Sequence, residues 1–181
     1  VLGSRGLGDV YKRQIQWKTW SFPHKSHEKL KVKEGGFTMV TNFDYLKNES
    51  KFSAFANVAI SAEKIILADP DASILNSRRA MEFAVKWLYS VENSLQIPYQ
   101  DNLHTLMNTE EFRQLVGPDL WKRMDYIRRC GNSVAHSNKK PGRDAAMLCL
   151  ENLSIFLDYV AYCYGEPVSY THLRAHETLR H

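Results

Sequence analysis

Apolar residues recur at intervals of three and four along four long stretches of this chain, and this spacing predicts helices. No stretch alternates apolar and polar residues for long enough to predict a strand. The clearest helix covers residues 143–164, and its predicted apolar face consists of Ala146, Leu150, Leu153, Leu157, Val160 and Tyr164. Other long helices are predicted over residues 50–67, 70–91 and 118–137, and short ones over 43–46, 102–107 and 110–116. The expected fold is therefore an all-α bundle of four longer helices plus short connecting helices.

Residues that favour helix ends agree with this division of the chain. Asp69 precedes Pro70, a pair that suits the cap and the first turn of a helix. Asn108 or Thr109 is expected to cap the short helix that follows, and Pro118 to begin the next long one. Gly165 is expected to end the last helix.

The two ends of the chain differ from the middle in charge and in pattern. Residues 39–167 carry 14 Lys or Arg and 16 Asp or Glu, whereas the remaining residues carry 10 and 4. The overall net charge of +4 therefore comes from the ends, and the middle segment lacks the general positive charge of a nucleic-acid-binding domain.

We interpret residues 1–38 and 168–181 as non-native, and we expect both segments to be disordered. The end sequences VLGSRGLGDVYKRQ and VSYTHLRAHETLRH resemble translated sequencing-adapter DNA. The codons of KEGGFTM can contain a purine-rich ribosome-binding sequence, which would make Met39 the natural start. The alternative is that both ends are genuine disordered tails. On the first interpretation, residues 39–167 form the only domain, and the histidines of the end segments do not indicate a metal site.

The sequence indicates a cytoplasmic protein without cofactor or metal. Its three cysteines, Cys130, Cys149 and Cys163, contain no CxxC pair and are expected to be small buried thiols. No apolar run is expected to be long enough to span a bilayer, so no membrane partner is predicted. Motifs for phosphate-binding loops, dinucleotide-binding loops, nucleophile elbows and zinc sites do not occur.

The segment RRCGNSVAH places polar residues and a glycine within the helix expected over 118–137. At about 100° per residue, Gly131 lies on the apolar face, where a glycine allows another helix to approach closely. The opposite face presents Asp125, Arg129, Asn132 and His136 on successive turns. Lys139 and Lys140 follow in the next loop. These six residues form the predicted interaction face.

Arg129 and His136 are the candidate catalytic residues of this face. Histidine transfers protons near neutral pH, and arginine binds or stabilises phosphate charge. Asparagine can orient the imidazole or bind a base. A purely structural alternative is that Asp125 and Arg129 form an ordinary ion pair, while Asn132 and His136 bind neighbouring segments. Similarly, Arg78 and Arg79 are expected to pair locally with Glu82.

Arg129, six intervening residues and His136 resemble the arginine–x4–6–histidine motif of the HEPN superfamily of small helical bundles. The phrases AEKIILADPDASILNSRRAMEFAVKWLYS, IPYQDNLHTLM, FRQLVGP and IRRCGNSVAHS resemble more specifically one HEPN-like domain of unknown function. That domain occurs at the N-terminus of type I restriction enzyme R subunits and related DEAD/DEAH-box helicases. The resemblance covers about residues 39–166. It implies that Arg129 and His136 correspond to the superfamily's catalytic pair.

Three functions follow as hypotheses. The first is a non-catalytic accessory domain that binds nucleic acid or protein. The chain would then be a fragment of an R subunit. Its partners would be the nuclease and helicase modules of that subunit and the other subunits of the restriction complex. The second is a metal-independent ribonuclease that acts as a homodimer. The third is a purely structural bundle.

Overall fold

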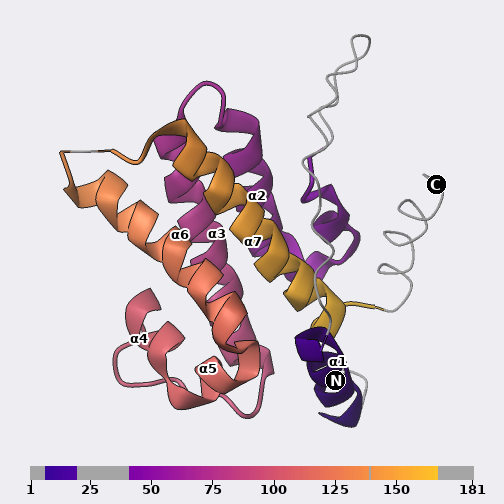
Figure 1. Ribbon diagram of the computed structural model, residues 1–181. Helices are drawn as coiled ribbons and strands as arrows, with labels where there is room; N and C mark the ends of the chain where they lie inside the picture. The colour runs from indigo at the N-terminus through magenta and orange to yellow at the C-terminus, as the bar shows by residue number, and fades with distance from the viewer. Residues whose placement is uncertain (1–6, 20–40, 139, 167–181) are drawn as a thin grey trace.

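The computed structural model describes residues 7–19, 41–138 and 140–166. This part of the chain contains only helices and their connections, so the all-α prediction is confirmed (Figure 1). The long helices are α2 Ser53–Ile65, α3 Pro70–Val91, α6 Pro118–His136 and α7 Gly142–Tyr164. Short elements are the 3-10 helices η1 Asp44–Asn48 and η2 Ser50–Phe52, together with α4 Leu103–Asn108 and α5 Glu110–Val116. A further helix, α1, covers Leu7–Thr19.

Local caps explain where several helices begin. The Asp69 side chain accepts a hydrogen bond from the backbone N–H of Ala72 at 2.9 Å, and this caps α3 as predicted. Thr109, rather than Asn108, caps α5 by accepting from Phe112 at 3.3 Å. Before α6, Gly117 has a φ of +78°, which only glycine adopts without strain.

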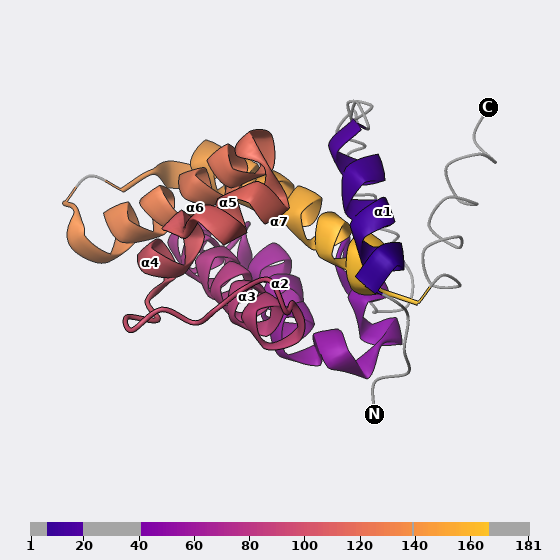
Figure 2. The same ribbon diagram turned by 90° about the horizontal axis from the view of Figure 1, so that it is seen from below.

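Helix α3 lies at the centre of the bundle and packs against α2, α6 and α7 (Figures 1 and 2). Its contact face is lined by small and medium-sized buried side chains, which allow all three neighbours to approach: Ser73, Ile74, Ser77, Ala80, Met81, Ala84, Val85 and Leu88. Towards its C-terminal end, Trp87 makes edge contacts with Phe52 at 5.4 Å and with Tyr164 at 5.7 Å. Aromatic contacts at these distances stabilise beyond simple burial.

Three side-chain hydrogen bonds to backbone carbonyls hold α4 and α5 against the long helices. Tyr89 of α3 donates to Leu106 O at 2.8 Å, and Trp121 of α6 donates to Met107 O at 2.7 Å. Tyr159 of α7 donates to Leu115 O at 3.2 Å. These carbonyls lie near the ends of short helices, where backbone acceptors lack partners within the helix.

The start of the chain differs from its expectation, because residues 7–19 form a packed helix rather than a disordered segment. Trp17 is buried, and its ring lies 5.7 Å from that of Tyr159 and 5.6 Å from that of Tyr162. Arg13 donates to the Gly165 carbonyl oxygen at 3.1 Å, just beyond the end of α7. The other residues of the segments 1–38 and 168–181 lie outside the described residues, and the non-native origin of both ends stays a prediction.

Helix α7 corrects the expectation that no segment is apolar and long enough to cross a membrane. Within the described ranges, Gly142–Tyr164 is both long enough and apolar enough to cross a bilayer. However, most of its apolar part is buried inside the bundle. Packing against α3 and α6 therefore accounts for its apolar composition without a bilayer.

Glu63 of α2 is a carboxylate almost completely buried in this core, with 4% of its surface exposed. It accepts hydrogen bonds from the backbone N–H of Asn42 at 2.9 Å and from the Asn42 side-chain amide at 2.7 Å. Burial outweighs these bonds and raises the pKa of Glu63 above its ordinary value of 4.5. The carboxylate thus fixes the segment before η1 at some cost in stability near neutral pH.

We expect the free energy of unfolding of the wild type to fall, relative to that of the Glu63→Gln variant, as rising pH ionises the buried Glu63. Because the pKa of Glu63 is raised on folding, its contribution is complete below pH 4.5 and is lost as pH rises through the folded-state pKa. Urea unfolding of both proteins from below pH 4.5 to neutrality measures the difference. Glu111→Gln makes the same change at an exposed position and serves as the control. A difference between wild type and Glu63→Gln that stays constant with pH would contradict this prediction.

Candidate interaction face on α6

Helix α6 carries the polar motif and is anchored by the face predicted to be apolar. Leu120, Met124, Ile127 and Gly131 are buried, and Val134 packs against the core while half-buried. The rotation of the helix is therefore as the apolar spacing predicts. The positions of the polar side chains follow from this rotation and from what α3 and α4 present to them.

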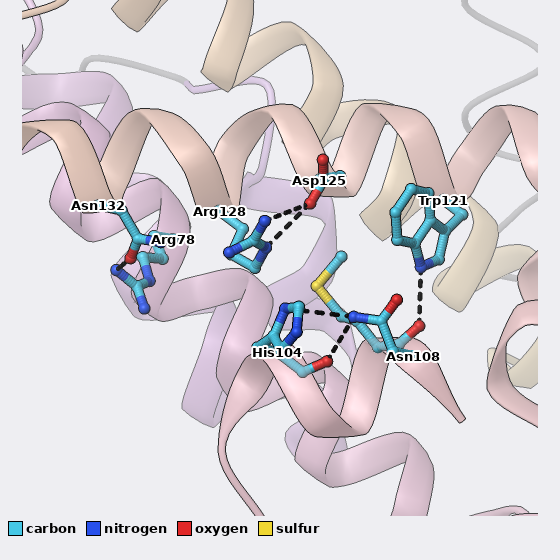
Figure 3. Close-up of polar contacts among 8 residues, drawn as sticks. Arg78, His104, Asn108, Trp121, Asp125, Arg128 and Asn132 are labelled. Carbon is cyan, nitrogen blue, oxygen red and sulfur yellow. Dashed lines mark hydrogen bonds and ion pairs between the residues drawn. The ribbon is translucent and has the colours of Figure 1, made fainter.

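Gly131 provides the space through which Arg78 of α3 crosses α6. A Cβ atom at residue 131 would lie 2.5 Å from Cδ of Arg78 and 3.1 Å from its Cβ, both closer than van der Waals contact. The Arg78 side chain continues over this gap, and its Nη1 donates a hydrogen bond to Oδ1 of Asn132 at 2.5 Å (Figure 3). A close approach of another helix was expected at Gly131. The group that approaches it there is the side chain of Arg78.

Asp125 pairs with Arg128, which corrects the expected Asp125–Arg129 ion pair. Oδ1 of Asp125 accepts from Nε of Arg128 at 2.9 Å and lies 2.8 Å from its Nη2. Arg128 is three residues away and half-buried, whereas Arg129 is exposed. A partly buried partner at this spacing is held in place by its surroundings, which explains why it is preferred to a solvated one.

Arg129 and His136 both lie exposed on α6. No hydrogen bond or ion pair joins either side chain to another residue in the ranges 7–19, 41–138 and 140–166. They are seven residues apart, which places them two turns apart on the same side of the helix. Lys122 is also exposed and precedes Arg129 by seven residues. Sequence reasoning missed Lys122, although the same seven-residue spacing could have indicated it.

The expected six-residue face therefore divides into two parts. Asn132 and Asp125 bind Arg78 and Arg128, whereas Arg129 and His136 remain open to solvent. Lys140 lies 2.8 Å from Asp71 near the start of α3, and this hydrogen bond and ion pair raise the pKa of Lys140. Lys139 lies outside the described residues.

The expected pairing of Arg78 and Arg79 with Glu82 is also wrong, because Glu82 pairs with Lys86 at 3.1 Å. The Arg79 guanidinium instead lies 5.4 Å from the centre of the Phe83 ring. A glycine on the buried face of α6 indicates that some other group fills the gap, but it does not identify Arg78 as that group.

The Cys149 thiol and the Tyr126 hydroxyl, both near this face, lie in surroundings that raise their pKa values. Cys149 is buried, and burial raises the pKa of its thiol, with a further contribution from nearby Cys130. Burial, followed by the effect of Cys130, raises the pKa of Tyr126 to about 12. All three cysteines were expected to be buried. Cys149 and Cys163 are buried, but Cys130 is only half-buried. No group of three or more His, Cys, Asp or Glu suited to a metal occurs in the described part of the chain.

We expect Gly131→Ala to lower the free energy of unfolding by about 1 kcal/mol, although alanine normally favours a helix by a similar amount. The added methyl group would displace Arg78 from Asn132. Chemical denaturation measures the change, and Ala135→Gly at an exposed position of α6 measures helix propensity alone. In an Arg78→Ala background, which keeps only the Cβ contact at 3.1 Å, Gly131→Ala should destabilise less. An equal effect of Gly131→Ala in both backgrounds would show that the Arg78 side chain does not occupy this gap.

Comparison with known proteins gives a family but no described function. No curated protein and no solved structure matches the sequence. One family, described as "Domain of unknown function (DUF4145)", matches residues 61–177. This match includes α3 to α7 and therefore every residue of the face on α6, while α1 lies outside it. Since the match covers more than half of the sequence, the chain belongs to this family of domains of unknown function, DUF4145.

Proposed function

We propose that this domain is a non-catalytic accessory module that binds the phosphate backbone of nucleic acid through the exposed side of α6. The observation that supports the proposal is the presence there of two side chains, Arg129 and His136, that no described residue engages. Several cationic side chains near α6 already have a partner: Arg128 binds Asp125, Arg78 binds Asn132 and Lys140 binds Asp71. Arg129 and His136 are therefore available to a ligand.

The spacing along α6 suits an extended anionic ligand. Lys122, Arg129 and His136 are separated by seven residues each, which is about 10.5 Å of helix at 1.5 Å per residue. A row of separated side chains that donate hydrogen bonds, two of them cationic, can contact successive parts of one backbone without reading its sequence. The segment 39–167 has a net charge of −2, so the attraction would be confined to this face.

We further propose that the domain is HEPN-like and part of a type I restriction enzyme R subunit. The support is the sequence resemblance over residues 39–166, together with a helical fold in which the arginine and histidine of the motif share one side of a helix. In such a protein, nuclease and helicase modules would act on the same DNA. A domain that binds backbone phosphates would then add affinity without adding sequence preference.

A second candidate function is metal-independent RNA cleavage by a homodimer. It is favoured by the same exposed arginine and histidine, because a base and a phosphate-binding group must be accessible to substrate. The third candidate function is purely structural. Among the residues of the predicted face, only Asp125 and Asn132 favour it. Their partners, Arg128 and Arg78, belong to the packed junction of α6 with the bundle.

We expect Arg129→Gln to weaken binding of a short single-stranded oligonucleotide and to reduce the dependence of log K on log salt concentration by about one unit. Fluorescence anisotropy at several salt concentrations measures both quantities. Lys64→Gln removes one charge from the exposed side of α2 and should change neither. Equal affinities for wild type and Arg129→Gln would exclude the exposed side of α6 as the contact.

We expect no RNA cleavage by the wild-type protein in excess chelator. The matched variants are His136→Ala and His104→Ala, since His104 is an exposed histidine on α4. Product analysis by gel electrophoresis measures the activity. If wild type and His104→Ala cleave while folded His136→Ala does not, the domain is a ribonuclease, and the accessory function is wrong.

A further inference from the structure

A second group of cationic side chains lies on the side of α6 that faces the bundle. Figure 3 shows Arg128 and Asp125 of α6 on the same side of the helix as the contact between Asn132 and Arg78 of α3. Asp125, Arg128 and Asn132 follow one another at spacings of three and four, so they form one ridge. Helix α4, with His104, lies across from this ridge in the same view. We call Arg78, Asp125, Arg128 and Asn132 the arginine seam.

The two guanidinium groups of the arginine seam retain unused donors. A guanidinium carries five N–H groups. Arg78 donates from Nη1 to Asn132, and its other nitrogen atoms have no acceptor among the described residues. Arg128 directs Nε and Nη2 to a single oxygen of Asp125, which leaves Nη1 without a described acceptor. Asp125 is the only carboxylate within this group, so its fixed charge is +1.

These donors are also held in place. The Arg128 and Asp125 side chains are 17% and 18% exposed, respectively, so both are largely shielded from solvent. Arg78 is half-buried, and its aliphatic part lies against Gly131. Side chains that are already ordered lose little conformational entropy when a ligand binds. Exposed arginines, such as Arg129, lack this advantage.

We propose that Arg78 and Arg128 form a phosphate-binding position for a nucleic-acid strand, distinct from the exposed row Lys122, Arg129 and His136. The inference rests on the proposed nucleic-acid-binding function and adds a second point of contact. Two guanidinium groups match the several oxygen atoms of a phosphate through parallel N–H donors. Asn132 acts as a positioning residue, because its amide oxygen orients Arg78. Asp125 holds Arg128 in place but also competes with the phosphate for it.

The test uses two substitutions that change binding in opposite directions. Arg128→Lys keeps the charge and a partner for Asp125 but removes the guanidinium, and we expect it to weaken oligonucleotide binding roughly fivefold. Asp125→Asn removes the competing charge, and we expect it to strengthen binding several-fold even if it lowers stability. Fluorescence anisotropy with a labelled single-stranded oligonucleotide measures affinity, and circular dichroism confirms folding. Arg123→Lys is the matched control, because Arg123 of α6 donates to Asn152 on α7 at 3.0 Å and lies outside the seam.

A second measurement separates this inference from the proposed function. Inorganic pyrophosphate is titrated into the wild-type protein while NMR follows the guanidinium Nε–H signals. Shifts of the Arg78 and Arg128 signals at concentrations that leave Arg123 unchanged support the seam as a phosphate site, even if no oligonucleotide binds and the proposed function fails. If oligonucleotide binds but neither seam variant alters affinity, the inference is wrong and the exposed row alone carries the function. Unchanged arginine signals would also overturn it.

Discussion

The crossing of Arg78 over Gly131 determines how the polar side of this bundle is arranged. Because residue 131 has no side chain, an arginine from the central helix passes over α6 and reaches Asn132. This contact joins α3 and α6. Any side chain at residue 131 would either separate the helices or remove the arginine, and a well-packed interior tolerates such added volume poorly.

Helix α6 has two chemically different sides. Towards the bundle, charged groups of α6 satisfy one another or a neighbour, as with Arg128 and Asp125. Towards solvent, Arg129 and His136 keep their full hydrogen-bonding capacity. Consecutive arginines, 128 and 129, thus have opposite roles because they differ by about 100° around the helix axis. The proposed functions use this division, since a ligand can bind only groups that the fold leaves available.

Most of the fold could be predicted from the sequence because its helices have strong apolar periodicity and clear end signals. The range predicted for α3, 70–91, agrees with the structure, since Asp69 and Pro70 specify its start. The exposed positions of Arg129 and His136 also follow from rotation about α6. Pairing partners were harder to predict: Asp125 has arginines at both three and four residues, and only the surrounding helices favour Arg128. The role of Arg78 depends on a contact 54 residues away in sequence, which no local pattern encodes.

Because of the ion pair between Lys140 and Asp71, the C-terminal tip of α6 and the crossing at Gly131 differ in their sensitivity to ionic conditions. This pair attaches the connection after α6 to the first turn of α3, and the Lys140 side chain is 58% exposed. Dissolved ions screen such an exposed pair readily, whereas packing at Gly131 contains no comparable charge pair to screen. Concentrated electrolyte would therefore loosen the tip that bears His136 before it disturbs the helix crossing five residues earlier. The imidazole thus lies where the surrounding medium, rather than the core, controls how firmly the backbone is held.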